Sequence, residues 1–215
     1  MNTYHKIKTI YKRDPKNMRL IFEGQWSKPE FQFLANNNWV FTEKVDGTNI
    51  RVMWDGKNVS FNGKTDRAEL YKPLVKKLEE TFSTEDKREL FKNMFGEEGG
   101  VCLYGEGYGR KIQSGGNYIK DGNDFVLFDI KIGNLWLERE NVEDIANRLN
   151  TKIVPIVGKG TLFEAVELVK NGLISQWGDF EAEGLVCRPE VELKNRRGER
   201  VITKIKAKDF KNITN

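Results

Sequence analysis

A lysine followed by an aspartate and a glycine is the first candidate for chemistry. Lys44 lies in the segment Glu43-Lys44-Val45-Asp46-Gly47-Thr48-Asn49, after alternating apolar and polar residues that predict a strand. The Asp-Gly pair favours a tight turn, and the glycine lets the backbone approach a ligand closely. A lysine amine becomes nucleophilic once burial or neighbouring positive charge releases its proton, because the pKa of an ordinary lysine is about 10.4. We therefore look for other cations near Lys44.

A second group of lysines could supply that charge. Lys204, Lys206 and Lys208 recur at a period of two, which in a strand points all three side chains to one face. Neighbouring ammonium groups repel one another unless an anion lies among them, and they lower the pKa of an adjacent lysine. A nucleoside triphosphate is one such anion. An edge strand that is charged to prevent aggregation is the alternative.

Three carboxylates stand where apolar predicted strands meet loops. They are Glu106 in a glycine-rich segment, Asp129 after Phe128, and Glu183 before Gly184-Leu185-Val186. Each acid taken alone is more simply a turn residue or a salt-bridge partner. Together they could hold a metal ion, which would place positive charge on the pyrophosphate that develops during phosphoryl transfer.

These segments resemble motifs I, III, IIIa, IV and V of the covalent nucleotidyltransferases, the superfamily of polynucleotide ligases and mRNA capping enzymes. In chain order they are Lys44-Val45-Asp46-Gly47, Tyr104-Gly105-Glu106, Phe128-Asp129-Ile130, Glu183-Gly184-Leu185-Val186 and Lys204-Ile205-Lys206. With Thr48-Asn49 after the first motif, the chain is most similar to ATP-dependent RNA ligases of the type-2 phage group. The resemblance runs from about residue 40 to residue 210.

The resemblance implies a ligase that works in three steps. Lys44 would attack the α-phosphate of ATP, form lysyl–AMP and release pyrophosphate. The AMP would pass to a polynucleotide 5′-phosphate, and a 3′-hydroxyl would then displace it and form a phosphodiester. The alternatives are a capping guanylyltransferase, a small DNA ligase and a non-catalytic nucleic-acid-binding module, although such a module has no need to keep Lys44 beside Asp46 and Glu183.

The resemblance also assigns roles to single residues. Glu106 would bind the ribose hydroxyls, Phe128 would stack on adenine, and Asn49 would serve the steps that need nucleic acid. Glu183 and Asp129 would hold Mg²⁺ or Mn²⁺. The residues with implied catalytic roles are Lys44, Asp46, Asp129, Lys204 and Lys206. Those with implied nucleotide contacts are Glu43, Val45, Asn49, Lys64, Arg67, Glu106, Phe128, Glu183, Lys204 and Lys206.

Two features depart from the family pattern. The family usually has an arginine in the strand after motif I that contacts ribose or substrate phosphate, whereas this chain reads Gly63-Lys64-Thr65-Asp66-Arg67, so either Lys64 or Arg67 could fill that role. Only seven residues follow Lys208, which leaves no room for the C-terminal OB or helical domain of most relatives. The sequence therefore supports the activation step, in which lysyl–AMP forms, better than it supports complete sealing of two ends.

The elements that must position these residues form a mixed pattern. Predicted strands at 39–44, 50–54 and 59–61 look like a meander, and 68–95 has helical spacing with an interruption near 83–85. Strands follow at 101–104 and 124–130, separated by a glycine-rich loop over 105–122, then a hairpin to 135–137. Helices are predicted at 139–149 and 161–173, and strands at 184–188, 191–193 and 200–208. The pattern predicts an α+β fold of mostly antiparallel sheets flanked by helices, and the resemblance implies the ATP-grasp-like nucleotidyltransferase domain.

Composition indicates one globular domain over residues 1–215. The hydrophobic fraction of 38% can build a core, and no stretch approaches the roughly 18 apolar residues of a membrane span, so we expect a cytoplasmic monomer. The two cysteines, Cys102 and Cys187, lack CxxC spacing and are expected to be reduced core residues. His5 is the only histidine and lies in a polar segment, which argues against Ser-His-Asp chemistry.

Positive charge is concentrated near the end of the chain. Residues 188–211 hold nine Lys/Arg against four Asp/Glu, although the whole chain carries only +4. Such a concentration suits phosphate or nucleic acid, and a solvated basic face is the alternative. The expected partner is RNA with 5′-phosphate and 3′-hydroxyl ends, with DNA or a hybrid as further candidates.

Overall fold

The chain divides into two compact units. Residues 3–211 are described by the structure, which is a computed structural model. Unit 1 comprises the residues up to His5 together with Asp46–Val154, and unit 2 comprises Lys6–Val45 together with the residues from Pro155 onward. The earlier expectation of one domain over 1–215 remains a prediction.

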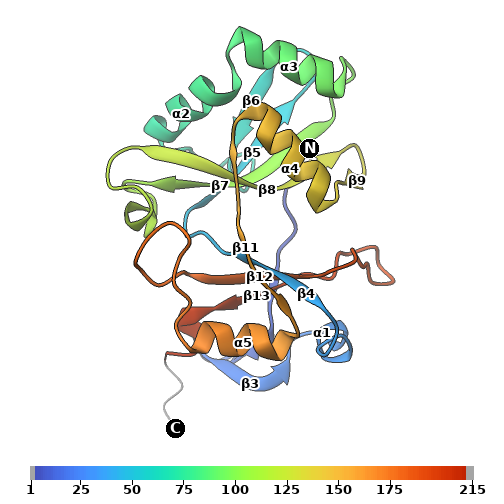
Figure 1. The fold of residues 1–215 in the computed structure, drawn as a ribbon, viewed down its shortest axis with the longest axis vertical. Helices are drawn as coiled ribbons and strands as arrows, with labels where there is room; N and C mark the ends of the chain where they lie inside the picture. The colour runs from blue at the N-terminus through green and yellow to red at the C-terminus, as the bar shows by residue number, and fades with distance from the viewer. Residues whose placement is uncertain (1–2, 212–215) are drawn as a thin grey trace. The chain divides into compact units, whose positions relative to one another are not determined.

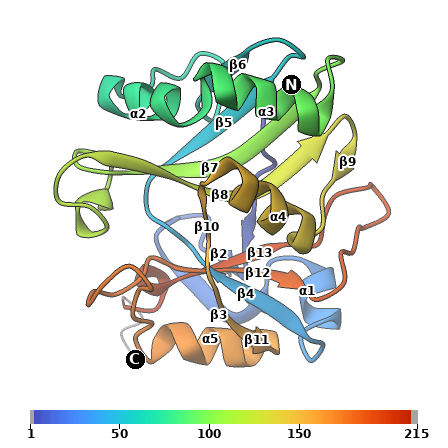
Figure 2. The same ribbon diagram turned by 45° about the horizontal axis from the view of Figure 1, so that its top comes forward.

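Unit 1 is built on a sheet whose strand order is β10-β8-β7-β5-β6, with β9 paired to β8 (β5 to β9 are labelled in Figure 1, and β10 in Figure 2). All of its pairings are antiparallel except that of β10 with β8. The strands are β5 (Thr48–Trp54), β6 (Val59–Asn62), β7 (Val101–Gly109), β8 (Asn123–Ile132), β9 (Leu135–Trp136) and β10 (Lys152–Ile153). The helices are α2 (Lys72–Phe82), α3 (Glu85–Phe95), the short η1 (Gly115–Asn117) and α4 (Arg139–Leu149).

One face of this sheet carries the core of unit 1. Alternate residues of β5, namely Ile50, Val52 and Trp54, are buried and pack with Leu74 and Leu78 of α2. The side chains between them point to the opposite face, because successive residues of a strand alternate. The predicted interruption near 83–85 is confirmed, since Thr84 caps α3 by accepting a hydrogen bond from the Lys87 amide.

Strand β7 extends into the segment that was predicted to be a loop. It continues to Gly109, and the prediction of a glycine-rich loop from residue 105 was wrong. A side chain at Gly105 would place its Cβ 2.2 Å from the ring of Phe125, and one at Gly107 would come 2.4 Å from Leu74. These glycines therefore make room for core side chains rather than form a flexible loop.

Unit 2 is built on a five-stranded sheet of order β1-β13-β12-β4-β11 (Figure 2). Only β1 and β13 are parallel neighbours in it. The strands are β1 (Lys8–Thr9), β4 (Trp39–Glu43), β11 (Ile156–Gly160), β12 (Gly184–Pro189) and β13 (Thr203–Lys206), with a separate pair β2 (Tyr11–Arg13) and β3 (Ile21–Trp26). The helices are α1 (Pro29–Phe33), α5 (Leu162–Lys170) and the short η2 (Ala207–Asp209).

Helix α5 covers the core of this second sheet. Its apolar face, which includes Leu162, Ala165 and Val169, packs with Leu185 and Cys187 of β12. A capping box between Thr161 and Glu164 fixes its start. The α+β class with mostly antiparallel sheets and flanking helices is thus confirmed.

Three strand predictions were wrong. The segments at 39–44, 50–54 and 59–61 do not form one meander, because β4 pairs with β12 and β11 while β5 pairs with β6 and β7. Residues 191–193 form no strand; Val191 is 72% exposed, and the segment meets its return in an isolated bridge between Lys194 and Arg200. The last strand ends at Lys206, so that Lys208 lies in η2 and is exposed instead of sharing the face of Lys204 and Lys206.

Within the described part of the chain, no helix has the length and apolar character needed to cross a membrane.

Candidate active site

Lys44 lies beside Glu183 and Lys206 in unit 2. Its Nζ is 2.5 Å from Oε2 of Glu183, and the Nζ of Lys206 is 2.8 Å from the other oxygen, Oε1. Each oxygen of this carboxylate therefore pairs with one lysine. The side chains of Lys44, Glu183 and Lys206 are only 21%, 12% and 17% exposed. This arrangement is a compact, partly buried group of alternating charge.

The strand pairing explains why residues so far apart in sequence meet. Strand β12 pairs on one side with β4, where Leu185 faces Glu43, and on the other with β13, where Gly184 faces Lys206. The Lys44 amide also donates to the Gly184 carbonyl at 2.9 Å. Gly184 has a φ of +147°, and a Cβ there would lie 1.9 Å from the Ile205 carbonyl oxygen. Only glycine allows β13 to come this close beside Glu183.

The lysines set the charge states in this group. Burial raises the pKa of Glu183, but Lys44 and Lys206 outweigh it, so the pKa lies below its usual range and the carboxylate is ionised at neutral pH. Burial lowers the pKa of Lys204 to about 8, helped by the positive charges of Lys206 and Lys44. At Lys204 the neighbouring cations thus add to the effect of burial, and the corresponding effect expected at the nucleophile Lys44 remains a prediction. Lys44 itself is ion-paired, and its amine must leave Glu183 before it can act as a nucleophile.

Glu43 and Val45, on either side of Lys44, are buried. The Glu43 carboxylate is 1% exposed and accepts hydrogen bonds from the Ser175 hydroxyl at 2.6 Å and the Gln176 amide at 2.8 Å. Burial raises its pKa in spite of these two bonds. Glu43 thus anchors the segment that leads to Glu183, and its predicted nucleotide contact remains a prediction, as does that of Val45.

Asp46 begins unit 1 and is fixed by the segment after β7. Its amide donates to the Tyr118 hydroxyl at 3.1 Å, and its Oδ2 accepts from the Ser114 amide at 3.3 Å. These bonds orient the backbone directly after Val45.

The face of the unit 1 sheet opposite the core gathers three more of the predicted residues. Asn49 pairs across the strands with Glu106, and Tyr104 pairs with Asp129. Directly opposed residues share a face, so Asn49, Glu106 and Asp129 all point away from the apolar core. A register shift between Tyr104 and Gly105 leaves Phe128 as an extra residue before Asp129.

Tyr4 holds Asp129, and the sequence did not reveal it. The Tyr4 hydroxyl donates to Oδ2 of Asp129 at 2.8 Å, and both side chains are buried. The Tyr4 ring also packs edge-on against Phe128, with 5.1 Å between ring centroids, and against Trp136 at 5.5 Å. Nothing in the polar N-terminal segment signals this contact, because it joins residues 125 positions apart.

Arg51 is a second residue that the sequence analysis missed. It is fully buried in β5, where its Nε donates to the Gly63 carbonyl at 2.9 Å and its guanidinium pairs with Asp66 at 2.6 Å. Arg51 thereby fixes the turn that carries Lys64 and Arg67, both of which are exposed. The position of this arginine between the apolar residues Ile50 and Val52 is the sequence feature that could have indicated a buried, functional side chain.

Comparison with known proteins gives the family. The model of the RNA ligase family matches residues 37–206, which is most of the chain. This chain belongs to the RNA ligase family. No protein of curated function matches the ligase-family chain in sequence.

Solved structures of Naegleria gruberi RNA ligase share the fold of this family member. The structure with PPi has a TM-score of 0.65 at 19% identity and covers 94% of this chain and 54% of that one. A variant with AMP and Mn has a TM-score of 0.66 at 17% identity, with coverages of 95% and 56%. A variant with ATP and Mn has a TM-score of 0.63 at 20% identity, with coverages of 84% and 54%. The chain therefore spans about half the length of these ligase chains.

The carboxylates of this family member offer few protein ligands for a metal ion. Among residues 3–211, no cluster of three or more His, Cys, Asp or Glu side chains could hold one. Glu183 already pairs with two lysines, and Asp129 accepts from Tyr4. Mg²⁺ commonly binds one or two carboxylates and takes its other ligands from substrate phosphates and water. The residues fit an ion that is bound together with a nucleotide.

Proposed function

We propose that this chain is an ATP-dependent RNA ligase whose nucleophile is Lys44. The observation that carries the proposal is the pairing of Lys44 and Lys206 with the two oxygens of Glu183, beside Lys204. Several ammonium groups around one carboxylate leave positive charge that a triphosphate can neutralise. Membership of the RNA ligase family supports the same assignment.

In the first step the amine of Lys44 leaves Glu183 and attacks the α-phosphorus of ATP. The ammonium group first loses one proton to water, which makes the amine nucleophilic. The Nζ–phosphorus bond then forms, the bond from that phosphorus to the pyrophosphate oxygen breaks, and a second proton passes from the nitrogen to water. Lys204 and Lys206 bind the phosphate oxygens and stabilise the negative charge on the leaving pyrophosphate. Glu183 or Asp129 would help to hold a divalent ion bound with the nucleotide, and such an ion would supply further positive charge to the reaction.

In the later steps the AMP is handed to RNA. An oxygen of an RNA 5′-phosphate attacks the adenylate phosphorus and frees Lys44, and a 3′-hydroxyl then attacks the activated 5′-phosphorus and expels AMP. We assign the ribose contact to Glu106, the adenine contact to Phe128 and a role in these steps to Asn49 on the family resemblance. Lys64 and Arg67, on the turn fixed by Arg51, remain the two candidates for a phosphate or ribose contact.

Labelling with nucleotides tests the first step. The protein is treated with pyrophosphate to remove any bound AMP, incubated with each α-labelled NTP and magnesium, and then denatured. We expect label from ATP alone, its loss in Lys44→Ala, and its retention in Lys208→Ala, the matched control on an exposed lysine. Label from GTP would indicate a capping guanylyltransferase instead. No label from any nucleotide would exclude the covalent mechanism.

A further inference from the structure

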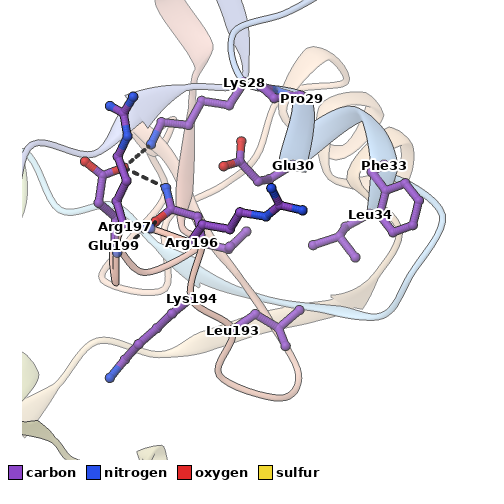
Figure 3. A pocket seen from close by; sticks show the side chains of 12 residues that line it. Lys28, Pro29, Glu30, Phe33, Leu34, Leu193, Lys194, Arg196, Arg197 and Glu199 are labelled. Carbon is purple, nitrogen blue, oxygen red and sulfur yellow. Dashed lines mark hydrogen bonds and ion pairs between the residues drawn. The ribbon is translucent and has the colours of Figure 1, made fainter.

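A pocket in unit 2 lies away from the lysine group. It has a volume of about 760 Å³ and is lined by α1, the residues just before it and the segment from Leu193 to Val201 (Figure 3). Neither the ligase motifs nor the steps described above use any of its residues.

The pocket carries an excess of positive charge. Lys28, Lys194, Arg196 and Arg197 line it, against two acids, Glu30 and Glu199. Glu199 is already engaged, since it accepts from the Lys28 ammonium at 3.1 Å and from the Asn195 side chain at 2.8 Å. Figure 3 shows the Arg196 side chain reaching into the space between its own segment and α1. The lining therefore suits a polyanion.

The segment that presents the arginines is held in a defined turn. The Gly198 amide donates to the Asn195 carbonyl at 2.9 Å, and the Asn195 side-chain oxygen accepts from the amides of Arg197 and Glu199 at 2.9 and 3.0 Å. Behind the turn, buried Arg200 pairs with Glu192. Arg196 and Arg197 thus stand next to each other at the tip, exposed, on a backbone that these hydrogen bonds hold in the turn.

An aromatic side chain completes the pocket. Phe33 of α1 is 86% exposed and contributes to the lining beside Leu34 and Leu193. Exposed aromatic rings next to basic side chains are typical of surfaces that bind single-stranded nucleic acid, where the rings stack on bases and the cations pair with phosphates.

We propose that this pocket binds the RNA strand at a distance from its reacting end, an inference that rests on the proposed function. Strand β12 links the two places, since Glu183 stands just before its first residue and the arginine turn follows its last. At about 3.3 Å per residue, the six residues of β12 span about 20 Å, and residues 190–194 connect its end to the turn. That length corresponds to roughly six nucleotides at the rise of a duplex, so an RNA engaged at Lys44 can reach the pocket.

Binding of a labelled 20-nucleotide, 5′-phosphorylated RNA, measured by anisotropy without ATP or magnesium over a salt series, tests this proposal. In Arg196→Ala/Arg197→Ala we expect about tenfold weaker binding and a salt slope smaller by about 1.4, because each phosphate contact on a single strand contributes about 0.7. Phe33→Ala should weaken binding at least fivefold with an unchanged slope. The matched control, Lys76→Ala/Arg88→Ala, removes the same charge from exposed positions of α2 and α3 and should bind like the unmodified chain.

The outcomes separate this inference from the proposed function. Formation of lysyl–AMP should be unchanged in the arginine variant, and its absence from the unmodified chain would count against the proposed function alone. Unchanged RNA binding in the arginine variant would overturn the proposal that the pocket binds RNA. An equal loss in the control variant would show that only net charge matters, and would overturn it too.

Discussion

At the scale of single residues, the three lysines around Glu183 differ in their surroundings. Lys44 and Lys206 are held by the carboxylate, whereas burial and the neighbouring cations lower the pKa of Lys204 to about 8. A phosphate bound beside Lys204 would offset the neighbouring positive charges and favour its ammonium form.

The lowered pKa of Lys204 makes stability depend on pH. At pH 7 both folded and unfolded chains carry the charge, and the folded state is destabilised by it; between about pH 8 and 10.5 only the folded chain loses the proton, so its relative stability rises. We expect Lys204→Met to be more stable than the unmodified chain at pH 7 by about 1 kcal/mol, after allowance for partial exposure, and the difference to shrink toward pH 10.

Denaturant unfolding at several pH values measures this difference. Lys208→Met, on the exposed lysine in η2, serves as the control and should leave the free energy of unfolding unchanged at each pH. A stability difference for Lys204→Met that is constant with pH would show that the lost side chain acts through packing and not through its charge.

At the scale of elements, periodicity predicted the strands and helices whose apolar faces line the two cores, such as β5, α2 and α5. It failed where an element depends on a distant partner. The short strands β10 and β11 exist only through pairing with β8 and β4, and the extension of β7 depends on close packing against Phe125. The order of the motif residues along the chain could be identified from the sequence. The hydrogen bond from Tyr4 to Asp129 and the ion pair between Arg51 and Asp66 could not, because only the fold brings these residues together.

A substitution at Gly105 tests whether β7 depends on close packing against Phe125. In Gly105→Ala the new methyl group would clash with the Phe125 ring, and because both lie in a packed core we expect a loss of about 1–3 kcal/mol in the free energy of unfolding. The control is Gly116→Ala, at a position where a Cβ meets nothing within 4 Å, and it should change stability by about 0.5 kcal/mol or less. Equal stability of the two variants would contradict the packing role of Gly105.

At the scale of the whole molecule, each unit has its own apolar core. The buried residues around Leu78 belong to unit 1 and those around Leu185 to unit 2. The chain passes from unit 2 to unit 1 directly after Val45, and returns after Val154.

Separate cores should give separate responses to core mutations. Leu185 is fully buried, so Leu185→Ala should lose about 2–5 kcal/mol in the stability of unit 2. Hydrogen exchange followed residue by residue should show the loss of protection concentrated in β4, β12 and β13. Leu78→Ala, the corresponding change in unit 1, should show it in β5, β7 and β8. An identical pattern of lost protection in both variants would contradict separate cores.

The close backbone contact at Gly184 limits which mutations its codon can accept. Any single-base change that turns a glycine codon into that of another amino acid adds a Cβ, and here that atom would lie 1.9 Å from a carbonyl oxygen of β13. A leucine or a lysine elsewhere in the chain can be replaced by a similar residue, but no other amino acid can replace this glycine without adding a Cβ. The codon for Gly184 therefore tolerates only synonymous changes for as long as the geometry around Lys44 is under selection.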